Sequence, residues 1–308
     1  MPKAVIHFCC VKSISMLVMV DNNFADRDGM RDYLGASRTH LAALSSTVLE
    51  EWFKAKSPHT TRRVQQIACA HSDQIIILKD TQDLLHMSGR QRGLLLRLID
   101  RQQTRDFAPY CDTVVNAPMT PELAAHFEAH RDRTQGIMDA LLPEARKMMS
   151  LFAAWDQELS TSQRNELKGI IEGDRKLSLG LQELTFHKAA KLGGSLFTAH
   201  KVMRANVPTT IPEMVNLLAF RYGAMMVALY IRLRSTGGTD VSSNKKVLNH
   251  LMDIKIAAQA TYLDGFMTHE SDLHNTYQIA VTLIAGLGGY THCGKSLAGR
   301  SANTDNVG

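Results

Sequence analysis

Short apolar runs separated by helical patterns occupy the first third of the chain. Residues 15–20 and 41–44 are runs of this kind, and residues 74–78 contain three consecutive isoleucines. Runs of this length that are apolar throughout predict strands buried on both faces of a sheet. Helical patterns over residues 27–35 and 62–70 lie between them. Because strands and helices alternate along the chain, the pattern predicts an α/β fold with a central parallel sheet.

A long helical region follows. The composition changes near Asn116, and residues 122–234 have an almost wholly helical pattern. Glu213–Leu233 is apolar on nearly every side, which predicts a helix at the centre of a bundle. The strand pattern returns at Gly265–Thr268. We therefore expect one discontinuous α/β domain and an all-helical insertion, with boundaries at 1–117 and 236–308 for the domain and 118–235 for the insertion.

Acidic residues lie at the ends of the predicted strands or in the helices that follow them. Asp21 directly follows the first strand. Glu50 and Glu51 are expected in the first turn of the helix that follows the predicted strand 41–44, and Asp253 opens a later helix. The full set is Asp21, Glu50, Glu51, Asp253, Glu270 and Asp272. Carboxylates gathered at one sheet edge repel one another unless a cation neutralises them. Their hard oxygen atoms favour Mg²⁺ or Mn²⁺, ions that support phosphodiester hydrolysis.

Two segments that contain the first of these acidic residues resemble motifs of the PIN-like nuclease family. Val18–Asn23 is similar to the family's opening strand with its aspartate. Leu49–Phe53 is similar to its second motif, a glutamate followed by an apolar and an aromatic residue. In that motif Glu51 is the match and Glu50 is its neighbour.

The last two segments resemble the third and fourth motifs of the same family. Asp253–Thr261 is similar to an aspartate that opens an alanine-rich helix, and Gly265–Leu273 to a strand followed by a threonine and an acidic residue. The two motifs have the separation typical of the family. Glu270 stands where aspartate or asparagine is commoner, so Asp272 is an alternative ligand. The long helical region between the second and third motifs has no counterpart in compact members.

The resemblance implies a three-layer α/β/α PIN-like domain that binds Mg²⁺ or Mn²⁺ and cleaves RNA in preference to DNA. It implies that Asp21, Asp253 and Glu270 hold the ion. The implied catalytic residues are Asp21, Glu51, Asp253, Glu270 and Asp272. The residues implied to orient these carboxylates are Asn23, Glu50 and Thr268.

A cluster of arginines predicts contact with nucleic acid. The net charge is +5, and five arginines lie between positions 90 and 105. Arg97, Arg101 and Arg105 are spaced four residues apart, so a single helix would align them on one face. A row of guanidinium groups suits a phosphate backbone, and a solvated helix face is the alternative. The expected nucleic-acid contacts are Arg90, Arg97, Arg101 and Arg105.

The cysteines and the lengths of the apolar runs indicate where in the cell the protein is expected. Five scattered cysteines without a C-x-x-C pair favour free thiols in a reducing cytoplasm. Since no uncharged apolar run reaches the roughly 18 residues needed to span a bilayer, we expect no membrane association.

His126 and His130 are four residues apart on a predicted helix, and we expect a surface pair, with metal binding as the alternative.

These observations favour a cytoplasmic, Mg²⁺- or Mn²⁺-dependent ribonuclease. Its expected partners are nucleic acid and a regulatory protein bound by the helical insertion, and an oligomer is compatible with the sequence. A toxin or phage-defence role follows from family analogy alone. Two alternatives stay open. One is the same fold without catalysis, acting as a nucleic-acid or protein-binding module; the other is a mostly helical interaction protein whose acidic motifs are coincidental.

Overall fold

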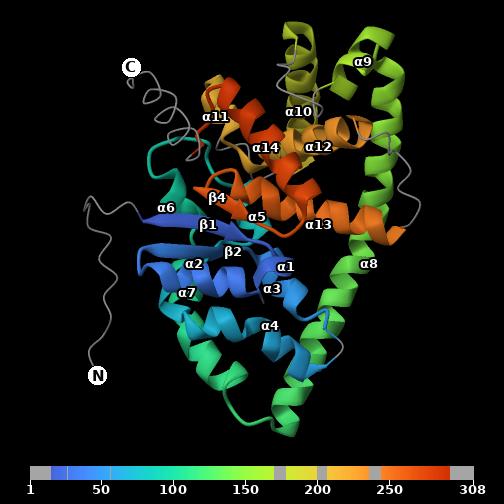
Figure 1. Ribbon diagram of the computed structural model, residues 1–308. Helices are drawn as coiled ribbons and strands as arrows, with labels where there is room; N and C mark the ends of the chain where they lie inside the picture. Colours follow the sequence, from blue (N-terminus) through green and yellow to red (C-terminus); the bar gives the residue numbers. More distant parts are fainter. Residues whose placement is uncertain are drawn as a thin grey trace, which may run out of the picture.

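The fold is mixed α/β, with many more helices than strands (Figure 1). The computed structural model describes residues 15–25, 27–55, 57–169, 178–199, 207–235 and 244–291. The predicted linker around residues 236–239 lies outside these ranges, so the structure says nothing about that boundary.

Four short strands form one fully parallel sheet. They are β1 (Met16–Val20), β2 (His40–Leu44), β3 (Ile75–Ile77) and β4 (Gly265–Met267). Their spatial order is β3-β2-β1-β4. The predicted strands and the parallel sheet are therefore confirmed. The pairing of Val20 with Met267 joins segments from the two ends of the chain, so the residues that follow β1 and β4 meet at one edge of the sheet.

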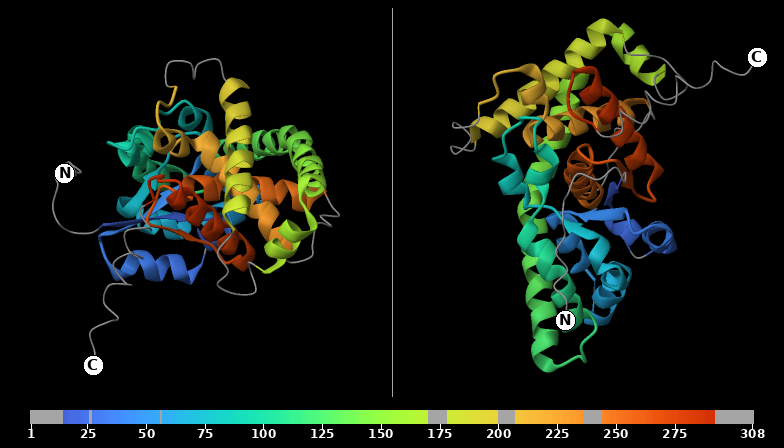
Figure 2. Two further views of the ribbon diagram at one scale, coloured as in Figure 1. Left: turned by 90° about the horizontal axis from the view of Figure 1, so that it is seen from above. Right: turned by 90° about the vertical axis from the view of Figure 1, so that its left-hand side faces the viewer.

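Helices connect the strands and cover the sheet. The connections are α1 (Asn22–Ala25) and α2 (Asp28–Ala36) after β1, and α3 (Ser46–Trp52), α4 (Pro58–Ala70) and the short 3₁₀ turn η1 (Ser72–Gln74) after β2. α2 packs against β2, and α13 (Asn244–Ala260) packs against β1 and β4. In the right-hand view of Figure 2 the blue helices and the teal helices lie on different sides of the strands.

In its described part, the chain between β3 and β4 forms helices joined by loops. Besides α13, the elements are α5 (Thr81–Leu85), α6 (Leu94–Leu98), α7 (Arg101–Tyr110), the π-helical turn η2 (Cys111–Val115), α8 (Pro121–Glu158), α9 (Thr161–Gly169), α10 (Leu179–Ala199), α11 (Ile211–Val215) and α12 (Leu218–Ser235). After β4, α14 (Ser271–Gly286) follows. α8 is 38 residues long and runs along one whole side of the molecule (Figure 1).

α12 lies at the centre of the helical part, as its all-round apolar pattern predicts. Its residues from Leu218 to Leu233 are buried, apart from partly buried Tyr222, and it packs against α10, α13 and α14. The sheet and these helices share one continuous core. Glycine permits the closest of these approaches, because a Cβ atom at Gly223 would lie 2.5 Å from the main-chain oxygen of Ala189 on α10. No helix in the described ranges combines the length and apolarity that crossing a membrane requires.

Two helix boundaries differ from the sequence prediction. The Ser45 side chain caps α3 by accepting a 3.2 Å hydrogen bond from the Val48 amide. However, α3 has only seven residues, so Glu50 and Glu51 occupy its last turn rather than its first. α13 starts at Asn244, well before Asp253. Asp253 therefore lies inside a helix and does not cap one.

The predicted row of arginines on one helix is wrong. Arg97 belongs to α6, whereas Arg101 and Arg105 belong to α7. The two helices are separated because Ile99 pairs with Leu78 as an antiparallel bridge beside the sheet. A backbone drawn into that pairing cannot continue a helix from one arginine to the next.

The expectation of free thiols is wrong for two cysteines. Cys69 at the end of α4 and Cys111 after α7 form a disulfide whose Cα atoms are 5.3 Å apart. Both residues are buried beside the core, far apart in sequence, and no spacing motif marks them. The other three cysteines lie outside the described ranges.

Candidate functional site

Asp21 is held rigidly at the carboxyl edge of the sheet. Its amide donates a 2.9 Å hydrogen bond to the Met267 carbonyl, which continues the pairing of β1 with β4. Its carboxylate accepts bonds from the Asn22 amide at 2.8 Å and from the Thr268 hydroxyl at 2.9 Å. The side chain is buried, with 3% of the residue exposed. The sequence-predicted partner Thr268 thus contacts the carboxylate that it was expected to orient.

Asn23 joins the loops after β1 and β4. Its side-chain amide donates to Glu270 Oε1 at 3.0 Å, and its amide oxygen accepts from the His269 amide at 3.1 Å and from the Thr268 hydroxyl at 3.3 Å. Both loops are therefore tied together through side chains about 245 residues apart. This network brings Glu270 to the same edge as Asp21.

Asp253 approaches the same place from α13. Its pKa is raised to about 8, first by burial and then by the negative charges of Glu270, Asp21 and Glu51, in that order, while Lys54 opposes the shift. Burial also raises the pKa of Asp21 to about 6; the Thr268 hydrogen bond opposes this effect, and Glu51 and Glu270 contribute to it. The mutual effect of these charges shows that four acidic side chains from four separate segments converge.

Adjacent glutamates of α3 face different places. Glu51 forms an ion pair with Lys54 and faces the converging acids. Glu50 does not line that cavity; it lines another one, where burial and the nearby Asp80 raise its pKa. Glu50 therefore faces away from the cavity that Glu51 lines, because neighbouring positions on a helix are about 100° apart; its expected support of the metal ligands stays a prediction.

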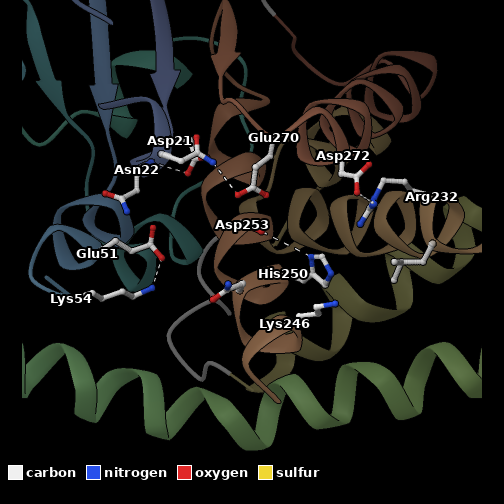
Figure 3. A pocket seen from close by; sticks show the side chains of 13 residues that line it. Asp21, Asn22, Glu51, Lys54, Arg232, Lys246, His250, Asp253, Glu270 and Asp272 are labelled. Carbon is white, nitrogen blue, oxygen red and sulfur yellow. Dashed lines mark hydrogen bonds and ion pairs between the residues drawn. The ribbon is translucent and has the colours of Figure 1, made fainter. Parts of the chain in front are cut away.

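Glu270 and Asp272 also take different roles. Asp272 pairs with the buried guanidinium of Arg232 at 2.7 Å, on the far side of the cavity in Figure 3. Glu270, rather than Asp272, raises the pKa of Asp21 and of Asp253. Of these two alternatives, Glu270 is the one that the structure places near Asp21 and Asp253.

A cavity of about 590 Å³ contains the acidic group and a set of cations (Figure 3). We call it the acidic cavity. It is lined by Asp21, Asn22, Asn23, Glu51, Lys54, Arg232, Leu233, Lys246, Asn249, His250, Asp253, Glu270 and Asp272. Its volume is in the usual range of ligand-binding pockets.

Sequence reasoning missed one side of this cavity, which we call the cationic wall for its two cations, Lys246 and Arg232; Asn249 is neutral, and burial lowers the pKa of His250 to about 4. Lys246, Asn249 and His250 precede Asp253 by seven, four and three residues, which places them near one face of α13. This signal was hidden because the helix was expected to start at Asp253. Arg232 comes from α12, and no local pattern connects it with the acids.

The donor set fits a hard divalent cation in its chemistry. The converging groups are carboxylates, and their raised pKa values mark a place where a positive charge would be stabilised. Within the described ranges, however, no three His, Cys, Asp or Glu side chains are already arranged as a metal site. Ion binding would therefore require the carboxylates to draw closer together.

The arginines predicted to bind nucleic acid do not line this cavity. The Arg97 guanidinium donates to the Arg92 carbonyl at 2.6 Å, to the Ser88 carbonyl at 3.1 Å and to the Arg90 carbonyl, so it braces the loop before α6. Arg90, Arg101 and Arg105 are exposed. Of the four, Arg97 has the clearest structural role.

No protein-family model matches the chain, and neither the curated proteins nor the solved structures contain a significant match. The argument for function therefore rests on the chemistry of the acidic cavity.

Proposed function

We propose that this protein is a Mg²⁺- or Mn²⁺-dependent phosphodiesterase that cleaves nucleic acid, RNA in preference to DNA, on a PIN-like fold. One observation carries the proposal: Asp21, Asp253 and Glu270, from distant parts of the chain, converge at the carboxyl edge of a parallel sheet. Burying mutually repelling carboxylates costs free energy, and such strain is typical of functional sites. The order of these acids along the chain agrees with the family resemblance.

Asp21, Asp253 and Glu270 would hold the ion, which when bound polarises a phosphoryl oxygen and lowers the pKa of a water molecule. The chain's own residues would orient these ligands. Thr268 donates to Asp21 and Asn23 donates to Glu270, so both carboxylates keep a fixed direction. Glu51, paired with Lys54, faces the same cavity as a carboxylate able to accept a proton from water.

The cationic wall supports a phosphate substrate. Lys246 and Arg232 line the acidic cavity opposite the acidic group, and Lys54 lies beside Glu51. A phosphodiester needs positive charge on both sides, from an ion at the reacting oxygen and from side chains along the backbone. A cavity with both signs of charge suits this substrate better than it suits a neutral one.

Cleavage by matched variants tests the proposal. Asp253→Asn and Asp21→Asn are expected to reduce Mn²⁺-dependent cleavage of single-stranded RNA to background, since each removes a ligand. Thr268→Val is expected to retain folding and to lose about 10- to 100-fold in rate, because it removes a hydrogen bond that orients Asp21. Asp139→Asn, on the exposed side of α8, is the control and is expected to cleave at the wild-type rate.

Two outcomes would contradict the proposal. One is a folded wild-type protein that cleaves neither RNA nor DNA with Mg²⁺ or Mn²⁺. The other is undiminished, metal-dependent cleavage by folded Asp253→Asn.

A further inference from the structure

Lys54 brings a positive charge into the acidic cavity from the end of α3. Its main-chain amide donates a 3.0 Å hydrogen bond to the Glu51 carbonyl, and its ammonium group pairs with the Glu51 carboxylate (Figure 3). Both residues line the acidic cavity. A main-chain bond and a side-chain pair between the same two residues thus hold the ammonium beside the carboxylate.

The turn that carries Lys54 is anchored to the long helix α8. Phe53, the residue before Lys54, is buried, and its ring stacks on His130 of α8 with the ring centroids 4.6 Å apart. The Phe53 ring also contacts Phe127, with centroids 5.9 Å apart. Partly buried His130, predicted as one of a surface pair, therefore helps to fix this turn. Because the backbone at Lys54 is fixed in this way, a change of partner at this residue involves its side chain.

The pair of Lys54 with Glu51 is more buried than an ordinary ion pair of the same spacing. In the pair of Lys147 with Glu144 on α8, also three residues apart, 73% and 58% of the side chains are exposed. For Lys54 and Glu51 the exposed fractions are 31% and 12%. Water and salt screen an exposed pair strongly and a partly buried pair much less. Glu51 therefore depends on the Lys54 ammonium for much of its neutralisation.

The charge of Lys54 also acts on a second acid of the cavity. Burial and three neighbouring carboxylates raise the pKa of Asp253 to about 8, and the Lys54 charge opposes this rise. Asp253 and Glu51 come from different elements and share the ammonium of Lys54 as a counter-ion. A divalent cation among the same carboxylates would carry twice that charge, and the two cations would repel each other.

We propose that Lys54 regulates metal loading of the acidic cavity: its ammonium holds Glu51 while the cavity lacks a metal ion, and it releases Glu51 when the cavity takes up a divalent cation. Both positive charges attract the same carboxylates and repel each other, so binding of one weakens binding of the other. Release frees Glu51 to accept a proton from water. This proposal rests on the proposed function, since it requires that the acidic cavity bind Mg²⁺ or Mn²⁺.

Binding of Mn²⁺ to the folded protein without substrate, followed through the electron paramagnetic resonance signal of the free ion, tests this exchange. Lys54→Met is expected to bind Mn²⁺ about tenfold more tightly than wild type, the effect of removing one unit charge several ångströms from a divalent ion. Lys54→Gln is expected to behave in the same way and replaces the methionine variant if that one does not fold. Lys54→Arg keeps the charge and is expected to bind no more tightly than wild type. Lys147→Met removes the cation of the exposed pair on α8 and should leave the affinity unchanged.

Lys246→Met separates direct competition from the net charge of the cavity. Lys246 lines the same cavity, but its charge acts on His250, and it lies away from Glu51 in Figure 3. Its replacement is expected to tighten Mn²⁺ binding by less than about threefold. Equal tightening in Lys54→Met and Lys246→Met would overturn the proposal. An affinity of Lys54→Met equal to that of wild type would overturn it as well.

This proposal and the proposed function fail in different ways. Tighter Mn²⁺ binding by Lys54→Met, in a protein that cleaves no nucleic acid, would support the exchange and contradict the phosphodiesterase. Equal Mn²⁺ affinities of wild type and Lys54→Met, in a protein that cleaves RNA, would do the reverse. If neither protein bound Mn²⁺, both proposals would be wrong.

Discussion

Replacing Asp253 with asparagine should stabilise the metal-free protein. The carboxyl group has a pKa of about 8 in the folded chain, against an ordinary value of 3.8, because it is buried beside Glu270, Asp21 and Glu51. At pH 7 the folded protein therefore keeps a proton that the unfolded chain has released. The difference of about three pKa units between 3.8 and 7 corresponds to a destabilisation of about 4 kcal/mol. Asparagine cannot ionise, so Asp253→Asn removes this cost.

The same reasoning sets the pH dependence. A carboxyl group whose pKa is raised on folding binds more protons in the folded state. Its contribution to stability is therefore complete below about pH 4 and is lost as the pH rises towards 8. Wild type should lose stability across this interval in EDTA, and Asp253→Asn should lose much less. Mn²⁺ should stabilise wild type more than the variant, so that wild type becomes the more stable of the two proteins.

Urea unfolding, followed by circular dichroism at several pH values, measures these differences. Asp139→Asn, an exposed aspartate on α8, should match wild type at every pH. The reasoning would be refuted if Asp253→Asn were less stable than wild type at pH 8 in EDTA. A wild-type stability that is flat from pH 4 to pH 8 would refute it as well.

Three further predictions concern the scaffold. Cys69→Ser should destabilise the oxidised protein by about 4 kcal/mol in urea unfolding, because the disulfide closes a loop with a sequence separation of 42. A reducing agent should lower the urea midpoint of wild type to that of Cys69→Ser. Gly223→Ala should lower the free energy of unfolding by about 1–3 kcal/mol, since its Cβ would clash with α10. Gly194→Ala meets no neighbour and should not destabilise the protein, and thermal melts of both variants test this difference. Ser45→Ala should cost about 1 kcal/mol by removing the cap of α3, and an unchanged melting temperature would contradict the capping role.

Much of the architecture could be predicted locally. All four strands were predictable because each is a short apolar run, and β1, β2 and β3 are largely buried, whereas β4 buries only Phe266. α12 was predictable as a central helix because its apolar residues surround it. The helix boundaries were harder, since nothing in the sequence before Asp253 stops α13 from extending back to Asn244.

Local patterns in the sequence indicated which segments form the strands and that acidic residues follow β1 and β4. These features depend on the periodicity of side chains along a few neighbouring residues. Packing in three dimensions brings Glu51 beside Asp21 while Glu50 lines a different cavity, and brings Glu270 to the acids while Asp272 pairs with Arg232. Local patterns could not give these outcomes, because the direction of a side chain depends on how its helix is rotated against its neighbours. Packing between separate elements, such as α3 against α13 and α12 against α14, sets that rotation, and no local pattern encodes it.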